Sequence, residues 1–148
     1  MMHFQRYDQI DWLTECRAEA VRLVLPLLVI DELDAKSYNS SPRGERVKKV
    51  LRSLEKARGD ASPELPVRVR DRVTYQVLMD PDGHQRRPNN DDEILSRAER
   101  LAELVGAKNV LIVTGDRGMK LRASARGLRC EILPDRLRIR EADKPDPS

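Results

Sequence analysis

The feature that most constrains the fold is an almost continuous apolar run over residues 21–30, Val-Arg-Leu-Val-Leu-Pro-Leu-Leu-Val-Ile. Such a run is typical of a strand that is buried on both faces of a parallel sheet. Pro26 has no backbone N–H to donate to a neighbouring strand, so a single strand cannot cover the whole run. We therefore expect a strand that ends at Leu25, followed by a turn and a short helix that carries residues 31–34.

Further along the chain, helical and strand periodicities alternate. Ser41 and Pro42 form a helix-start signature, and the apolar face that follows predicts a helix that ends before Gly59. Alternating apolar residues over 67–79 predict strands with a turn at 70–72. A further helix is predicted to begin at its cap, Asn90, with Glu93 completing a capping box, and to end at Gly106. After it we expect a strand over 109–113, a helix through 119–125 and a strand over 130–133.

This alternation predicts an α/β protein with three layers, in which helices cover both faces of a central parallel sheet. The length of 148 residues favours one domain, which we place at residues 1–139. The charged, proline-containing segment 140–148 is predicted to be a disordered tail.

Composition excludes several classes of protein. No apolar run approaches the roughly 20 residues of a membrane span, and no secretory signal opens the chain. Two cysteines, Cys16 and Cys130, provide neither a disulfide framework nor a zinc site. We therefore expect a cytoplasmic protein without a membrane partner. The net charge of +3 permits a nucleic-acid partner without demanding one.

Three acidic residues lie near the carboxyl edge of the predicted sheet, where ligands bind in α/β folds. They are Glu32, Asp91 and Asp116. Clustered carboxylates repel one another and are tolerated when a cation neutralises them, and oxygen ligands favour Mg²⁺ or Mn²⁺.

Each acid also has a structural interpretation. Asp91 suits the first turn of a helix, where it interacts favourably with the helix dipole. Glu32 fits a solvated helix face equally well, whereas Asp116 has no obvious packing role. His84, in a polar loop, is expected to be exposed. The basic face of the helix over 43–58 is more typical of solvation than of recognition.

Three segments, taken in order, resemble motifs of the PIN domain family of metal-dependent ribonucleases. Val-Leu-Pro-Leu-Leu-Val-Ile-Asp-Glu-Leu-Asp is similar to the family's second strand and following helix, and the resemblance assigns Glu32. Asn-Asp-Asp-Glu-Ile-Leu-Ser-Arg-Ala is similar to its Asp-x-x-Ile helix start, which gives Asp91, with Asp92 as a one-residue alternative. Val-Leu-Ile-Val-Thr-Gly-Asp-Arg-Gly-Met resembles its Thr-x-Asp strand end, which gives Asp116, with Thr114 as a support.

The resemblance implies an endonuclease of single-stranded RNA that depends on Mg²⁺ or Mn²⁺. Glu32, Asp91 and Asp116 would hold the ion, and three arginines, Arg43, Arg46 and Arg117, would contact phosphate. The family's first strand, which ends in a principal metal-binding Asp, has no counterpart in this sequence. We therefore expect impaired catalysis. Two explanations for the missing strand are that the sequence starts at an internal methionine of a longer gene product, or that it is a truncated homologue.

Other functions stay open on the sequence. One is a catalytically inactive module that binds nucleic acid or a protein, and another is a toxin nuclease held by an antitoxin-like partner. A homodimer is compatible with both. A different doubly wound fold, such as a phosphotransfer domain, leaves the matches at Glu32 and Asp91 unexplained.

Overall fold

The computed structural model describes residues 6–137, and these residues form two compact units. Within the described residues, the N-terminal unit covers 6–82 and the C-terminal unit covers 83–137. The expectation of a single domain over 1–139 stays a prediction. The predicted disordered tail, 140–148, lies outside the described residues.

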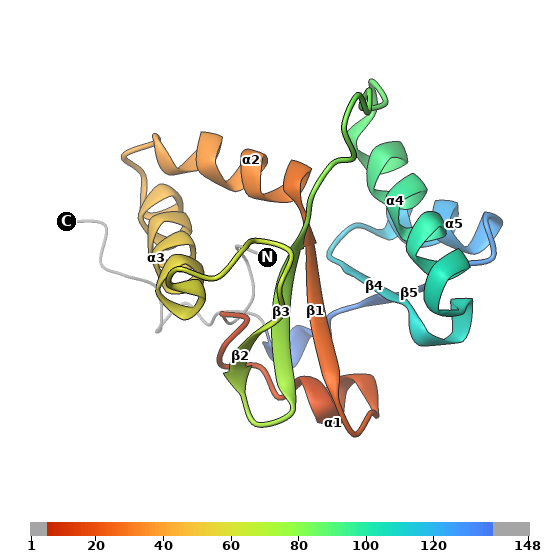
Figure 1. Ribbon diagram of the computed structural model, residues 1–148, viewed down its shortest axis with the longest axis horizontal. Coiled ribbons are helices and arrows are strands. Elements are labelled where there is room, and N and C mark those ends of the chain that lie inside the picture. The colour runs from red at the N-terminus through yellow and green to blue at the C-terminus, as the bar shows by residue number, and fades with distance from the viewer. Residues whose placement is uncertain (1–5, 138–148) are drawn as a thin grey trace. The chain divides into compact units, whose positions relative to one another are not determined.

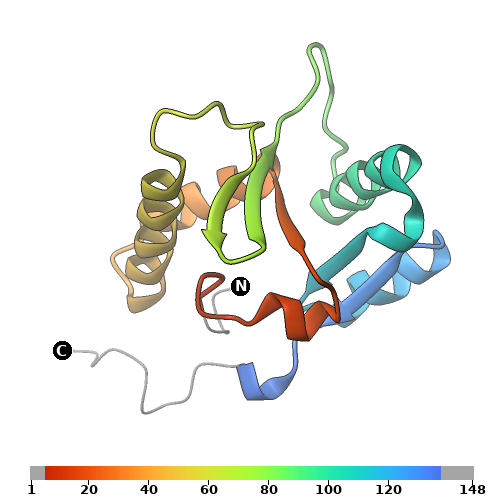
Figure 2. The same cartoon turned by 60° about the horizontal axis from the view of Figure 1, so that its bottom comes forward.

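The N-terminal unit contains a three-stranded mixed sheet in the order β1-β3-β2 (Figures 1 and 2). Its strands are β1 (Val21–Pro26), β2 (Val67–Arg70) and β3 (Val73–Leu78). β3 runs parallel to β1 and antiparallel to β2, and the tight turn between β2 and β3 places Arg72 at φ 57°. The predicted turn at 70–72 is confirmed. β3 is the inner strand, and its residues Val73 and Tyr75 are each only 1% exposed.

Three helices belong to the same unit: α1 (Trp12–Cys16), α2 (Leu27–Ser37) and α3 (Pro42–Arg58). The predicted turn after Leu25 is wrong, because α2 begins directly after Pro26, which is its N-cap. The second half of the apolar run is thus the first turn of a helix, and Leu28 and Leu33 are buried. A short apolar run does not distinguish a buried strand from a buried helix, which explains the error.

Tyr75 connects the sheet to α3 through its hydroxyl and its ring. The hydroxyl donates a hydrogen bond to the backbone oxygen of Leu54, and the Arg58 guanidinium lies 4.8 Å from the ring centroid. Tyr7 meets the same ring edge-on, at a centroid distance of 6.5 Å. The core of this unit therefore combines aliphatic packing with a buried, hydrogen-bonded aromatic residue.

The C-terminal unit is a parallel β-α-β unit preceded by a long helix (Figure 1). Its elements are α4 (Asn90–Val105), the 3₁₀ helices η1 (Ala107–Asn109) and η2 (Asp135–Leu137), β4 (Leu111–Thr114), α5 (Arg117–Ala125) and β5 (Arg129–Ile132). Leu95 and Ala123, both 0% exposed, join α4 and α5 in one apolar cluster with Met119, Leu128 and Cys130. Gly106 ends α4, as predicted.

The α/β class is confirmed, but the strands are distributed over two sheets instead of one. Within the described residues, β1 pairs only with β3, and β4 pairs only with β5. The β2–β3 turn and the β4–α5–β5 crossover are both local connections, so each sheet forms within its own unit. None of the described helices combines the length and the apolar character that crossing a membrane requires.

Candidate functional site

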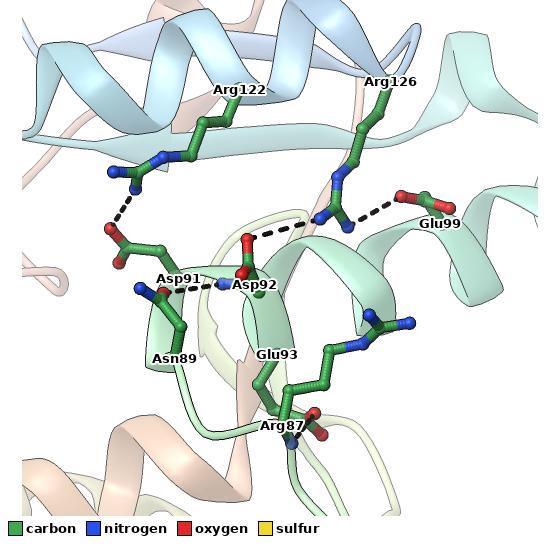
Figure 3. Close-up of polar contacts among 8 residues, drawn as sticks. All are labelled: Arg87, Asn89, Asp91, Asp92, Glu93, Glu99, Arg122 and Arg126. Carbon is green, nitrogen blue, oxygen red and sulfur yellow. Dashed lines mark hydrogen bonds and ion pairs between the residues drawn. The ribbon is translucent and has the colours of Figure 1, made fainter.

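The start of α4 carries three successive acidic residues, Asp91, Asp92 and Glu93. Asn89 caps this helix, and its side-chain oxygen accepts a hydrogen bond from the Asp92 backbone N–H at 3.1 Å (Figure 3). The predicted capping box of Asn90 and Glu93 is wrong by one residue, because the helix begins at Asn90 and the Glu93 side chain binds elsewhere.

Glu93 is a buried carboxylate, only 1% exposed. One oxygen, Oε2, accepts a hydrogen bond from the Arg87 backbone N–H at 2.9 Å, and the other lies 2.5 Å from Nε2 of His84. Burial alone would raise the pKa of Glu93, but these two hydrogen bonds and the charges of His84 and Arg97 outweigh it and lower the pKa. Glu93 is therefore held as a carboxylate.

His84 differs from the sequence expectation in its contacts. It lies in an exposed loop, as predicted, but its side chain is only 25% exposed and binds Glu93. The predicted polar surroundings do not reveal this pairing, because the partner lies nine residues away on α4. Its contact gives His84 a structural function: it satisfies one oxygen of a buried carboxylate.

Two arginines, one in α5 and one at its C-cap, pair with half-buried acids of α4 (Figure 3). Nη1 of Arg122 donates to Oδ2 of Asp91 at 2.7 Å. Arg126 donates to Asp92 at 3.3 Å and to Glu99 at 3.0 Å. The predicted ligand Asp91 and its alternative Asp92 are thus each paired with an arginine of the same unit.

Asp116 follows β4 and caps α5. Its Oδ1 accepts a hydrogen bond from the Gly118 backbone N–H at 2.8 Å, and its own N–H donates to Oγ1 of Thr114 at 3.1 Å. Asp116 therefore has a structural function that the sequence interpretation missed. The signal was present, since an aspartate directly before a helix is a favoured N-cap.

Gly118 reveals how close the candidate ligands of this unit lie. A Cβ atom placed on Gly118 would be 3.2 Å from Oδ1 of Asp116 and 4.0 Å from Nη2 of Arg122. The guanidinium that binds Asp91 and the carboxylate of Asp116 therefore both border Gly118. The fold thus brings residues that are 25 positions apart in the sequence, Asp91 and Asp116, to the surroundings of one arginine.

The other predicted site residues occupy the following places. Glu32 lies half-buried in α2, next to the buried Leu33, and Arg43 and Arg46 lie in the first turns of α3, all in the N-terminal unit. Arg117 is the first residue of α5 and is exposed, directly after Asp116.

The donor set around Arg122 fits a hard divalent cation. Asp91 and Asp116 present carboxylate oxygens, which are the ligands that Mg²⁺ and Mn²⁺ prefer. Arg122 already pairs with Asp91, and its Nη2 borders Gly118, as the Asp116 carboxylate does. A divalent ion bound to Asp91 would therefore have to replace this pairing.

Comparison with known proteins identifies the family. No curated protein matches the chain. The family model described as PIN domain matches residues 4–133, which is most of the 148-residue sequence. PIN domains are typically metal-dependent nucleases that bind nucleic acids. With this match added to the α/β fold, the chain belongs to the PIN domain family.

Proposed function

We propose that this chain is an endoribonuclease of impaired activity that cleaves single-stranded RNA with the help of Mg²⁺ or Mn²⁺. The observation that carries the proposal is that Arg122, which binds Asp91 at the start of α4, borders Gly118 together with the carboxylate of Asp116, the N-cap of α5. The nuclease function of the family supports the reaction class, and the RNA substrate follows from the resemblance of the motifs.

In this proposal Asp91 and Asp116 hold the ion. Asp91 is preferred to Asp92, because Asp91 pairs with Arg122, which borders Gly118 as Asp116 does, whereas Asp92 pairs with Arg126. When bound, such an ion polarises the scissile phosphodiester and activates a water for attack. The resemblance also assigns a metal-binding role to Glu32, which belongs to the N-terminal unit.

The remaining residues act on the RNA or on the ligands. Arg117 is exposed and follows Asp116 in the sequence, so we assign its guanidinium to phosphate binding. Arg43 and Arg46 extend phosphate binding over α3. Thr114 accepts a hydrogen bond from the Asp116 backbone, so we assign it the positioning of that carboxylate.

The test is cleavage of an unstructured, end-labelled RNA by the full chain, with Mn²⁺, with Mg²⁺ and with EDTA. Asp91→Asn and Asp116→Asn should each abolish metal-dependent cleavage. Asn caps a helix about as well as Asp, so Asp116→Asn keeps α5 intact. Glu103→Gln is the matched control, because Glu103 is an exposed carboxylate of α4 that pairs only weakly, at 3.4 Å, with Arg100.

Two results would contradict the proposal. Cleavage that persists in both Asn variants would show that these carboxylates hold no catalytic ion. Equal loss of cleavage in Glu103→Gln would show that the effect is one of general charge. Glu32→Gln, assayed in the same series, tests the further ligand separately.

A non-catalytic RNA-binding module is the second candidate. It is favoured by the contacts of both carboxylates, since Arg122 holds Asp91 and the Gly118 N–H holds Asp116. This candidate predicts salt-dependent RNA binding that survives Asp116→Asn, with no cleavage at any metal concentration.

A further inference from the structure

In this fold Asp91 already forms an ion pair with a cation, the guanidinium of Arg122. It donates to Oδ2 of Asp91 at 2.7 Å, and its other terminal nitrogen would lie 4.0 Å from a Cβ atom placed on Gly118, the residue whose N–H binds Asp116. We propose that Arg122 competes with the divalent ion for Asp91, so that metal binding requires this guanidinium to move aside. The inference rests on the proposed metal site and adds a residue that sets its affinity.

Competition follows from charge and space. A guanidinium and a divalent ion are both positive, so they repel each other when they share one carboxylate. Arginine stays protonated in proteins and cannot reduce this repulsion by losing a proton. The guanidinium must therefore move away from Asp91 when the ion binds. The Arg122 side chain is 49% exposed, so it has room to turn into solvent.

Arg126 provides an internal comparison. It lies four residues after Arg122, at the C-cap that directly follows α5, and carries the same charge. Its guanidinium pairs with Asp92 and Glu99 and not with Asp91. Direct competition therefore predicts an effect at Arg122 only, whereas a general field effect predicts similar effects at both arginines.

Displacement also gives Arg122 a second function. Once released, the guanidinium stays tethered to α5, beside Asp91 and Asp116. A planar fork of N–H donors binds phosphate oxygens in pairs. In the metal-free protein Arg122 would compete with the ion for Asp91, and in the metal-bound protein it would bind an RNA phosphate. RNA affinity would therefore depend on whether the metal site is occupied.

The test measures Mn²⁺ affinity of the full chain by the paramagnetic resonance signal of unbound Mn²⁺. The variants are Arg122→Gln, Arg122→Lys, Arg126→Gln and Asp91→Asn. We expect Arg122→Gln to bind Mn²⁺ about two- to five-fold more tightly, the range set by the strength of an exposed charge pair. Arg126→Gln and the charge-conserving Arg122→Lys should stay near the wild-type affinity.

The outcomes separate this inference from the proposed function. Unchanged or weaker Mn²⁺ binding by Arg122→Gln overturns the inference, as does equal tightening by Arg126→Gln. If Asp91→Asn still abolishes binding in those cases, the proposed metal site stands. If Mn²⁺ binding is insensitive to Asp91→Asn, the metal site and the inference fall together.

The phosphate function is tested by RNA binding with Mn²⁺ and without it. Mn²⁺ should increase RNA affinity of the wild-type chain more than that of Arg122→Gln. An equal gain in both proteins would remove Arg122 from phosphate binding. Arg126→Gln is again the matched control for loss of one positive charge.

Discussion

Replacing Glu93 by glutamine should destabilise the C-terminal unit, although the two side chains have nearly the same shape. The Glu93 carboxylate is 1% exposed, and its two oxygens bind His84 and the Arg87 backbone N–H. Glutamine carries no negative charge, so it removes the charge that strengthens both of these hydrogen bonds. A hydrogen bond to a charged group contributes about 1.5–3 kcal/mol, and we expect a loss of that size at neutral pH.

The assay is urea unfolding followed by far-ultraviolet circular dichroism, with Glu99→Gln as the control. Glu99 lies on the same helix, and its 44% exposed side chain pairs with Arg126. An exposed pair of this kind contributes about 0.2–1 kcal/mol. The reasoning is refuted if Glu93→Gln lowers the free energy of unfolding by no more than Glu99→Gln does.

The pH dependence gives the same experiment a second readout. The pKa of Glu93 in the fold is lower than its ordinary value of 4.5, so the folded state binds this proton less tightly than the unfolded state does. The stabilisation is therefore complete above pH 4.5 and is lost as the pH falls through the lower folded value. The difference in stability between wild type and Glu93→Gln should shrink in that acidic range; a constant difference would contradict it.

Three further substitutions test the two cores and a helix cap. Tyr75→Phe removes the hydroxyl that donates to the Leu54 backbone oxygen and should lower the free energy of unfolding in urea by about 0.5–1.5 kcal/mol. An unchanged free energy of unfolding would show that water replaces this hydrogen bond equally well in the unfolded chain. Leu95→Ala, at a fully buried position, should cost about 2–5 kcal/mol by the same assay, and a cost below 1 kcal/mol would contradict its place in the core. Asp116→Ala should cost about 1 kcal/mol in unfolding free energy through the lost cap on Gly118, whereas Asp116→Asn should cost little; equal losses would exclude capping as the cause.

Local signals in the sequence predicted much of the fold. Ser41 and Pro42 mark the start of α3, Gly106 marks the end of α4, and alternation over 67–79 marks β2 and β3. These features depend on residues close in the chain. The start of α2 was missed because residues 27–30 are apolar in any case, and only tertiary packing decides whether they extend a strand or begin a helix.

The candidate site was less accessible to sequence reasoning. The positions of Asp91 and Asp116 beside a helix start and a strand end were predictable from periodicity. The pairing of Asp91 with Arg122 was not, because that arginine is 31 residues from Asp91 and is one of many in the chain. Arg126 likewise reaches Asp92 over 34 residues. Long-range charge pairs follow from how helices pack, and composition contains no record of that packing.

Among residues 6–137, β1 pairs on one side only, with β3, and this has a consequence for amide hydrogen exchange. The Val21 N–H binds the Arg72 oxygen, so every second amide from Val21 onward faces the β3 side of the sheet. The N–H groups of Arg22 and Val24 then point away from β3, toward the opposite edge of β1. Pro26 is the next residue with this orientation, so its missing N–H removes no hydrogen bond to β3. Exchange along β1 should therefore alternate between slow and fast, residue by residue. A strand that joined this edge would slow Arg22 and Val24 together, so these two amides report directly whether the edge is occupied.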